Sequence, residues 1–165
     1  MQIGEPDIIS VVVELGKTLP RFPGGRVDYH SATAAPVLSA AVRFEKKLLL
    51  LKRSSQVHYY KGRWNVVAGY LDEPVALHKK VFAELHEELG VRQEQVRQLT
   101  YVNPIIYNDT DVGVRWTIFP TLLDLREFPV LKLNEEHTEY RWVLPDEISQ
   151  FSLVPPLSEM LATFL

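Results

Sequence analysis

The sequence predicts an α/β (α+β) fold, an α/β/α sandwich in which helices cover a mixed β-sheet. Short apolar runs rich in β-branched residues alternate with turn residues along most of the chain. One long amphipathic segment, residues 74–89, interrupts these runs, and two short helical patterns follow the last of them. With 165 residues, the chain has the length of one domain with a single sizeable core.

The first half of the chain contains four candidate strands. Residues 8–15 are rich in Val and Ile and predict an opening strand, an accessory hairpin or edge, before a loop with Pro and Gly at positions 20–25. Residues 37–44 and 47–52 flank a charged Glu-Lys corner, a pattern typical of an antiparallel pair. Residues 64–68 predict a further strand that runs into a glycine.

The second half is organised around a helix predicted at residues 74–89. Pro74 is tolerated in a first turn, acidic Asp72 and Glu73 suit the positive end of the helix dipole, and Gly90 is a good stop. After this helix the pattern predicts three strands, at residues 98–107, 113–125 and 138–144. Two short helices are predicted to follow, at residues 146–151 and 157–164.

Composition and charge exclude several classes of protein. The 18 Lys and Arg residues against 21 Asp and Glu residues leave a net charge of -3, which provides no basic field to attract a polynucleotide. We expect no membrane partner, because no apolar run reaches the roughly 18 to 20 residues that span a bilayer. The N-terminus lacks the pattern of a secretory signal, so we expect a cytoplasmic protein. There is no cysteine, which excludes disulfides, thiolate metal sites and cysteine nucleophiles.

Three glutamates on the predicted helix have a spacing that suits metal binding. Glu84, Glu87 and Glu88 are at i, i+3 and i+4, so they share one helix face. An apolar stripe from Val81 to Leu89 lies beside them and can pack on the sheet. Such close like charges repel, and in a cleft divalent cations are the natural compensation. A solvated acidic face is the alternative, and the spacing alone favours that alternative.

Residues 69–91 resemble the signature of the Nudix hydrolases, the Nudix box. That pattern reads Gly, five residues, Glu, seven residues, Arg-Glu, a bulky apolar residue, any residue, Glu-Glu, any residue, Gly and a bulky apolar residue. Seven of its nine fixed positions are present, namely Gly69, Glu84, Leu85, Glu87, Glu88, Gly90 and Val91. The runs at residues 48–54, 62–69 and 135–148 also resemble the family's flanking strands and closing helix. The resemblance implies a Nudix-like domain at residues 35–165, with residues 1–34 as an N-terminal extension or accessory strand packed on it.

The chain departs from the box at two positions. Val75 replaces the first box Glu, and Ala83 replaces the box Arg. In the family these two residues form a salt bridge that orients the metal-binding helix. Both charges are absent together, so neither is left buried without a partner. We expect either an apolar contact or Glu73 to orient the helix in place of this salt bridge. The simpler interpretation of Glu73 is a role at the start of the helix. We expect a functional but slower hydrolase.

The resemblance implies a metal-dependent hydrolase that cleaves a pyrophosphate bond in a nucleoside diphosphate linked to another moiety. It implies Glu84, Glu87 and Glu88 as ligands of Mg²⁺ or Mn²⁺, with Glu87 and Glu88 as catalytic residues. Oxygen ligands suit these hard cations, which neutralise phosphate charge and activate water.

Some family members place a further catalytic acid in the loop before the closing strand. Glu136, six residues before Trp142, is our candidate for this role. Its simpler interpretation is that it is merely one of several exposed acidic residues in a loop. Asp109 and Asp111 compete with it, because a turn can also present carboxylates.

The candidate substrate contacts are Arg53, for a phosphate, and Tyr60, Gly69 and Tyr107. Tyr59, Tyr70 and Trp116 offer further stacking surfaces, although core packing is the simpler interpretation of Trp116.

Two rival functions are weighed against hydrolysis. Residues 51–54 and 60–64 also resemble the isopentenyl-diphosphate isomerase branch of the superfamily, but that isomerase needs a catalytic cysteine. A binding module that has lost turnover is favoured by Val75 and Ala83 and opposed by the three retained carboxylates. The substrate is left open among ADP-ribose, dinucleoside polyphosphates, nucleotide sugars and noncanonical nucleoside triphosphates. The oligomeric state is also open, a homodimer included.

Overall fold

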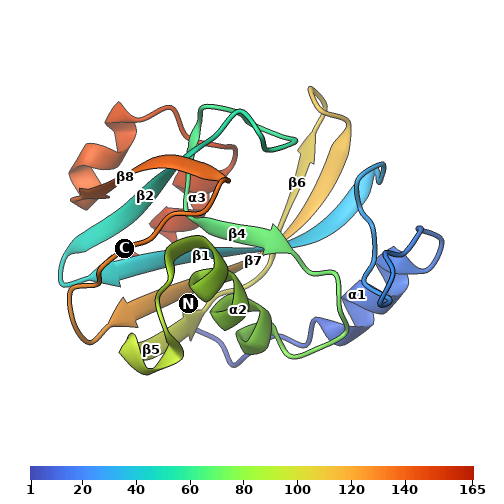
Figure 1. Cartoon of the computed structure of the whole chain (residues 1–165), viewed down its shortest axis with the longest axis horizontal. Helices are drawn as coiled ribbons and strands as arrows, with labels where there is room; N and C mark the ends of the chain where they lie inside the picture. Colours follow the sequence, from blue (N-terminus) through green and yellow to red (C-terminus); the bar gives the residue numbers. More distant parts are fainter.

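The computed structural model describes residues 1–165 and contains one mixed sheet of eight strands (Figure 1). The strands are β1 (Ala34–Phe44), β2 (Lys47–Arg53), β3 (Trp64–Asn65), β4 (Val67–Tyr70), β5 (Val96–Tyr101), β6 (Ile105–Asp109), β7 (Val114–Leu125) and β8 (His137–Val143). Their main order is β3-β2-β1-β7-β5, with β4 beside β1, β6 beside β7 and β8 beside β2. Only β1 and β7 pair in parallel, which confirms the predicted mixed sheet.

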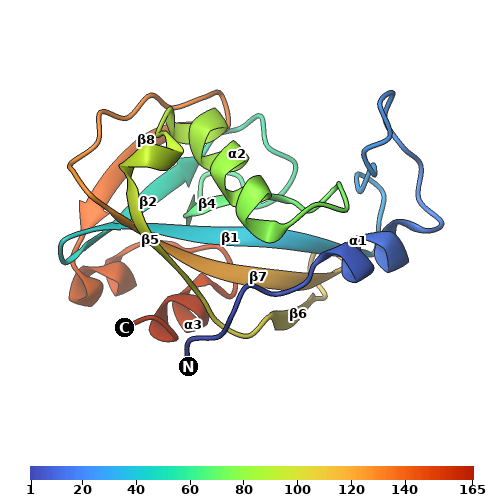
Figure 2. The same ribbon diagram turned by 90° about the horizontal axis from the view of Figure 1, so that it is seen from below.

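Helices cover both faces of this sheet. They are α1 (Ile9–Gly16), α2 (Leu77–Leu89), α3 (Leu157–Ala162) and the 3₁₀ helices η1 (Gln93–Gln95) and η2 (Pro145–Gln150). Figure 2 shows α2 on one side of β1 and α3 on the other. None of these helices combines the length and the apolar character that crossing a membrane would need.

The central strands are apolar on both faces because each face packs against helices. Along β2, Leu49 and Leu51 belong to the core under α1 and α2, whereas Leu48 and Leu50 belong to the core under α3. All four leucines are 1% exposed or less, so the run is a strand buried on both sides. The antiparallel pair predicted around the Glu-Lys corner is therefore confirmed as β1 and β2.

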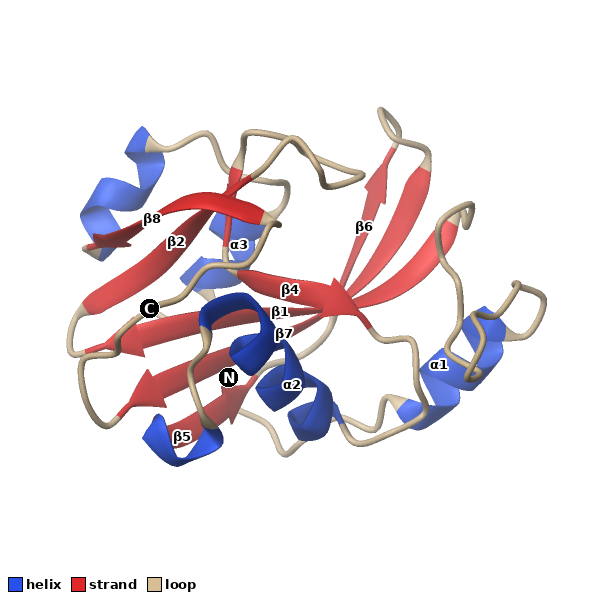
Figure 3. Cartoon of the chain, viewed as in Figure 1, coloured by secondary structure: helices blue, strands red, loops and turns tan.

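The opening strand predicted at residues 8–15 is wrong, because this segment forms helix α1 (Figure 3). Ile8, Val12 and Gly16 are buried at intervals of four, which places them on one helix face. Asp7 accepts a backbone N–H of the first turn at 2.9 Å. Local β preference is thus overridden by packing of this face into the core.

Two predicted strands are each divided in the structure. The segment at residues 64–68 forms β3, which pairs with β2, and β4, which pairs with β1. The segment at residues 98–107 forms β5 and β6, which pair with successive parts of β7. Pro104 lies between β5 and β6, where a ladder donor is missing.

The central helix ends where the sequence predicts and begins later. Gly90 has a left-handed φ of 71° and closes α2 by donating its N–H to the His86 carbonyl at 2.8 Å. At the other end, Ala76 is extended and the helix begins at Leu77, so Pro74 lies outside it. The two short helices predicted near the C-terminus are η2, which is a 3₁₀ helix, and α3.

The N-terminal segment, residues 1–33, lies against the sheet and against α2. Ile3 bridges to Tyr101 at the end of β5. Glu5 accepts the backbone N–H of His78 at 2.8 Å, and its carboxylate also lies 2.6 Å from the His78 ring. The segment contains a helix in place of the predicted accessory strand, and a domain boundary near residue 34 stays a prediction.

We predict that Glu5→Ala lowers the free energy of unfolding by about 1 kcal/mol, the usual effect of losing a helix cap. The Glu5 side chain satisfies a donor in the first turn of α2, where backbone N–H groups lack partners within the helix. Urea unfolding measures the change, and Glu5→Gln should recover part of it. Glu14→Ala, an exposed acidic position on α1, is the control. An equal loss in Glu14→Ala would show that acidic charge, and not capping, matters.

Candidate active site

A cavity of about 470 Å³ lies on the α3 side of the sheet. Its walls come from β1, the loop between β2 and β3, β4, β7, the loop before β8 and the segment that leads into α3. The lining residues are Val37, Leu38, Ser39, Arg53, Gln56, Val57, His58, Tyr59, Tyr60, Asn65, Ala68, Gly69, Tyr70, Trp116, Ile118, Glu135, Glu136, Val154, Pro155, Pro156, Leu157 and Met160. This lining is apolar and aromatic over most of its extent, with a few polar groups at one end.

Aromatic rings form one wall of the cavity. The Tyr59 and Trp116 rings meet edge to face with centroids 5.3 Å apart, and Tyr70 lies 6.3 Å from Trp116. Trp116 is buried in the core, which agrees with its simpler interpretation, and it also lines the cavity, so its role in stacking stays a prediction. Tyr107 does not line the cavity, and the structure therefore leaves it apart from the other candidate substrate contacts.

Tyr60 is held in an unfavourable backbone conformation by hydrogen bonds of its side chain. Its φ is 58°, in the left-handed region that side chains other than glycine rarely adopt. The Tyr60 hydroxyl donates to Asp109 at 2.5 Å and accepts from the Trp116 ring N–H at 3.0 Å. Asp109, a competitor for the catalytic acid, is buried and engaged in positioning this tyrosine. The hydroxyl is already bonded on both sides, so Tyr60 presents chiefly its ring to the cavity.

Arg53 lies between the aromatic wall and the acidic end of the cavity. Its Nε donates to the Tyr59 carbonyl at 2.9 Å, which fixes the guanidinium. Burial lowers the pKa of Arg53, and the nearby charges of Glu136 and Glu88 oppose that effect. The arginine thus places a positive charge where an anionic group of a ligand can be bound.

Two carboxylates of α2 lie against β4 beside this end, although no residue of α2 belongs to the lining. A Cβ on Gly69 would come within 2.7 Å of the Glu84 carboxyl, so only glycine allows this approach. Glu88 is 1% exposed and accepts the Ala68 N–H at 3.3 Å. Glu136, in the loop before β8, lines the cavity and is oriented by Asn134, whose side chain donates to it at 2.9 Å.

Burial and mutual repulsion change the acidity of these groups. Burial first, and then the charge of Glu87, raise the pKa of Glu84 from 4.5 to about 7. Burial, followed by the charges of Glu136 and Glu84, raises the pKa of Glu88 well above its ordinary value. The charges of Glu84, Glu88 and Glu136 therefore act on one another, while their roles as ligands and catalytic acid stay predictions. Glu87 lies on the same face of the helix but is exposed.

The carboxylate oxygens of Glu84 and Glu88 are of the kind that divalent cations such as Mg²⁺ prefer as ligands. Glu88 is a buried oxygen donor and Glu84 a half-buried one, and their raised pKa values mark charges that lack compensation within the protein. In this structure no three His, Asp or Glu side chains converge around a common point with the spacing of metal ligands. Side-chain rotation would have to bring the oxygens together, and the assignment of ligands stays a prediction.

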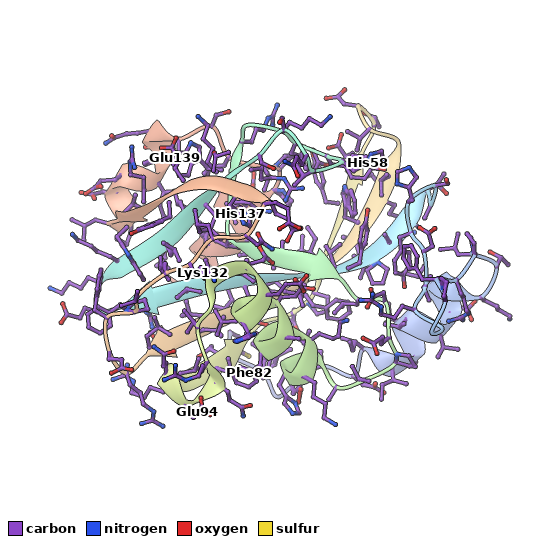
Figure 4. The ribbon with its side chains drawn as sticks, viewed as in Figure 1. His58, Phe82, Glu94, Lys132, His137 and Glu139 are labelled. Carbon is purple, nitrogen blue, oxygen red and sulfur yellow. The ribbon has the colours of Figure 1, made fainter.

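Several residues of the site were not predicted from the sequence. His137, which follows Glu136, is buried with its Nε2 at 3.5 Å from a Glu88 oxygen (Figure 4). Burial first, and then Arg53, lower the pKa of His137 to about 4, so this histidine is neutral at pH 7. Asn65 and Ser39 are buried polar residues that line the cavity. Their position as polar residues within apolar strand segments is the sequence signal that could have identified Asn65 and Ser39.

Comparisons with known proteins agree with the box. The NUDIX domain family matches residues 29–164. Nucleoside triphosphatase NudI of Escherichia coli strain K12 is 26% identical over 117 residues, which are 64% of this chain and 78% of that protein.

Solved structures with low identity share the fold. The MutT NUDIX hydrolase from Burkholderia pseudomallei has a TM-score of 0.68 at 20% identity, over 80% of this chain and 98% of that one. A C. elegans Ap4A hydrolase binary complex has a TM-score of 0.64 at 18% identity, over 79% and 94%. The NUDIX domain of Shewanella oneidensis NrtR complexed with ADP ribose has a TM-score of 0.65 at 16% identity, over 79% and 88%.

The family match spans the box helix, the sheet and every part of the cavity wall. It confirms the predicted fold and the predicted enzyme class. The chain belongs to the Nudix family and is a Nudix-type pyrophosphohydrolase.

Proposed function

We propose that this protein is a Mg²⁺- or Mn²⁺-dependent hydrolase that cleaves the pyrophosphate bond of a nucleoside diphosphate linked to another moiety. The observation that carries this proposal is a cavity with an aromatic wall whose lining includes Arg53 and Glu136. Beside it, Glu84 and Glu88 of α2 lie close enough for their charges to act on each other and on Glu136. The acidic end suits metal and phosphates, and the aromatic wall suits a base. Relatives that are a nucleoside triphosphatase, an Ap4A hydrolase and a domain complexed with ADP ribose support this choice.

Each part of the site has a role in this reaction. Glu84, Glu87 and Glu88 would hold the cation, which would neutralise phosphate charge and lower the pKa of water. Arg53 would bind a phosphate beside them, with its guanidinium fixed by the Tyr59 carbonyl. Glu136 would accept a proton from the attacking water, since it lines the cavity close to the helix carboxylates.

The aromatic wall would bind the base. Tyr59, Tyr60, Tyr70 and Trp116 offer ring faces and edges, and Gly69 of β4 also lines the cavity and would contact the ligand. We keep Tyr107 as a weaker candidate, because it lies outside the lining. A cytoplasmic location, a homodimer and the absence of polynucleotide partners also stay predictions.

A panel of nucleoside diphosphate derivatives, assayed for phosphate-containing products with and without Mg²⁺, tests the proposal. We expect Mg²⁺-dependent cleavage of at least one compound. Glu87→Gln and Glu88→Gln should each lower kcat by about 100-fold or more while changing the melting temperature little, because they remove ligand charge and keep shape. Equal losses of folding and activity would point to a structural role.

The control for these variants is Glu94→Gln. Glu94 is an exposed acid on η1, far from His58 and the cavity (Figure 4). Binding of panel compounds without cleavage, with or without metal, would favour the rival binding module.

The response of stability to metal should depend on pH. The pKa of Glu84 is about 7 in the folded protein against its ordinary 4.5, so the folded state holds this proton more tightly than the unfolded chain does. The contribution of Glu84 to stability is thus present below about pH 4.5 and is lost as pH rises through 7. Since a cation binds the ionised form, the rise in melting temperature caused by Mg²⁺ should increase from pH 5 to pH 8. A metal effect that is independent of pH, or unchanged in Glu84→Gln, would contradict this.

Tyr59→Leu should raise KM by about 5- to 150-fold, which corresponds to loss of about 1 to 3 kcal/mol of stacking on a base. The Tyr59 side chain contributes its ring to the wall, where it meets Trp116. The matched control is Tyr140→Leu, because Tyr140 is an exposed tyrosine of β8 outside the lining. Steady-state kinetics on the best panel substrate measure both variants, and a normal KM in Tyr59→Leu would remove this residue from the binding site.

A further inference from the structure

Lys80 is a buried charge on the helix that carries the acidic residues. It lies on α2 with its side chain 9% exposed. Its Nζ donates to Asp72 at 2.6 Å and to Glu73 at 3.1 Å. A buried lysine is costly unless it is paired, and here two carboxylates compensate it. The cluster of these three residues is called the Lys80 clamp below.

The Lys80 clamp joins the segment after β4 to α2, the two elements that meet where Glu84 lies against Gly69. Asp72 and Glu73 follow β4 after one intervening residue. Lys80 lies one helical turn before Glu84, on the same face of α2. The ion pairs therefore tie the segment after β4 to the turn of α2 that places the Glu84 carboxyl over Gly69.

The two positions of the family's box salt bridge carry no charge in this chain. Val75 is half-buried, and Ala83 is exposed. We propose that the Lys80 clamp takes over the function of this missing pair and positions α2 for metal binding. Lys80 is thus a positioning residue that acts through Glu84. The inference rests on the proposed metal-dependent hydrolysis.

Asp72 is held from a second side. Arg26, in the N-terminal segment, lies 3.8 Å from its carboxylate, and the Val27 N–H donates to the Asp72 carbonyl at 3.0 Å. Asp72 is consequently a fixed anchor, 15% exposed, on which Lys80 can orient the helix. Removal of Lys80 leaves Asp72 with its Arg26 partner, so the segment after β4 keeps part of its support.

The test measures Mn²⁺ affinity directly, by the electron paramagnetic resonance of free Mn²⁺, together with kcat and the melting temperature. Lys80→Met keeps the length of the side chain and removes the charge. We expect it to weaken Mn²⁺ binding by about 10-fold, the size of effect usual for residues that orient metal ligands. Lys80→Arg should bind Mn²⁺ within about 3-fold of wild type, since it keeps two directed donors. Lys79→Met, at the exposed neighbouring lysine, should match wild type.

A rescue variant separates orientation from stability. Val75→Glu with Ala83→Arg restores the box pair, and in the Lys80→Met background we expect it to recover most of the Mn²⁺ affinity. In the wild-type background the same double change should alter affinity less than 2-fold, because the helix is already oriented. Wild-type affinity in folded Lys80→Met, or no recovery on restoring the pair, would overturn the proposal.

Glu73→Gln covers the case in which Lys80→Met does not fold. Its side chain is 43% exposed, and Asp72 still pairs with Lys80 in this variant. We expect about 3-fold weaker Mn²⁺ binding at an unchanged melting temperature, and unchanged affinity would overturn the role of the clamp. If wild type itself bound no Mn²⁺, the proposed function would fall, and the positioning role with it. Normal binding in wild type with unaltered binding in the clamp variants would overturn the clamp alone.

Discussion

The contact between the Glu84 carboxyl and the backbone at Gly69 is the constraint on which the site depends. A helix and a strand meet here with the Glu84 side chain directly against the backbone, because a Cβ on Gly69 would lie 2.7 Å from the carboxyl. The contact brings Glu88 within hydrogen-bond reach of Ala68 in the same strand. The direction of α2 across the sheet, and hence the place of the acidic end of the cavity, follows from this approach.

The close approach is electrostatically unfavourable, and the rest of the domain offsets it. Buried carboxylates that repel one another raise their own pKa values, as Glu84 and Glu88 show. The apolar stripe of α2 holds them there, since Val81, Leu85 and Leu89 are fully buried in the core on that face of the sheet. Hydrophobic burial of this kind is large compared with one repulsive pair, so the fold can maintain a strained charge cluster for function.

The sequence predicted most of what depends on local pattern. The box, the end of α2 at Gly90 and the β1–β2 pair are local signals, and each agrees with the structure. Arg53, Tyr60 and Glu136 also lie in the cavity lining as their predicted roles require. Features that depend on contacts between distant segments were missed or misjudged. Strand preference at residues 8–15 was outweighed by tertiary packing.

The same limit explains errors at the site. The sequence around Asp109 indicates a turn that presents its carboxylate, but only the fold brings this carboxylate to the hydroxyl of Tyr60, 49 positions earlier. Tyr107 pairs with Trp116 across β6 and β7 and so shares its face of the sheet, but no residue of β6 lines the cavity. His137 carries no motif, and its importance appears only when its imidazole is found beside Glu88.

The N-terminal segment has a closer connection with the site than its position outside the box suggests. The family match begins at residue 29, yet Glu5 satisfies a donor at the start of α2 and Arg26 contacts Asp72. The helix has no side-chain cap of its own at Ala76, so its first turn depends on this distant carboxylate. A chain that lacks the box salt bridge thus orients α2 through contacts at its first turns, from the N-terminal segment and from the residues after β4. The polar contacts that support α2 thus lie toward its N-terminal end, while Glu84, Glu87 and Glu88 near its C-terminal end keep the spacing of the box.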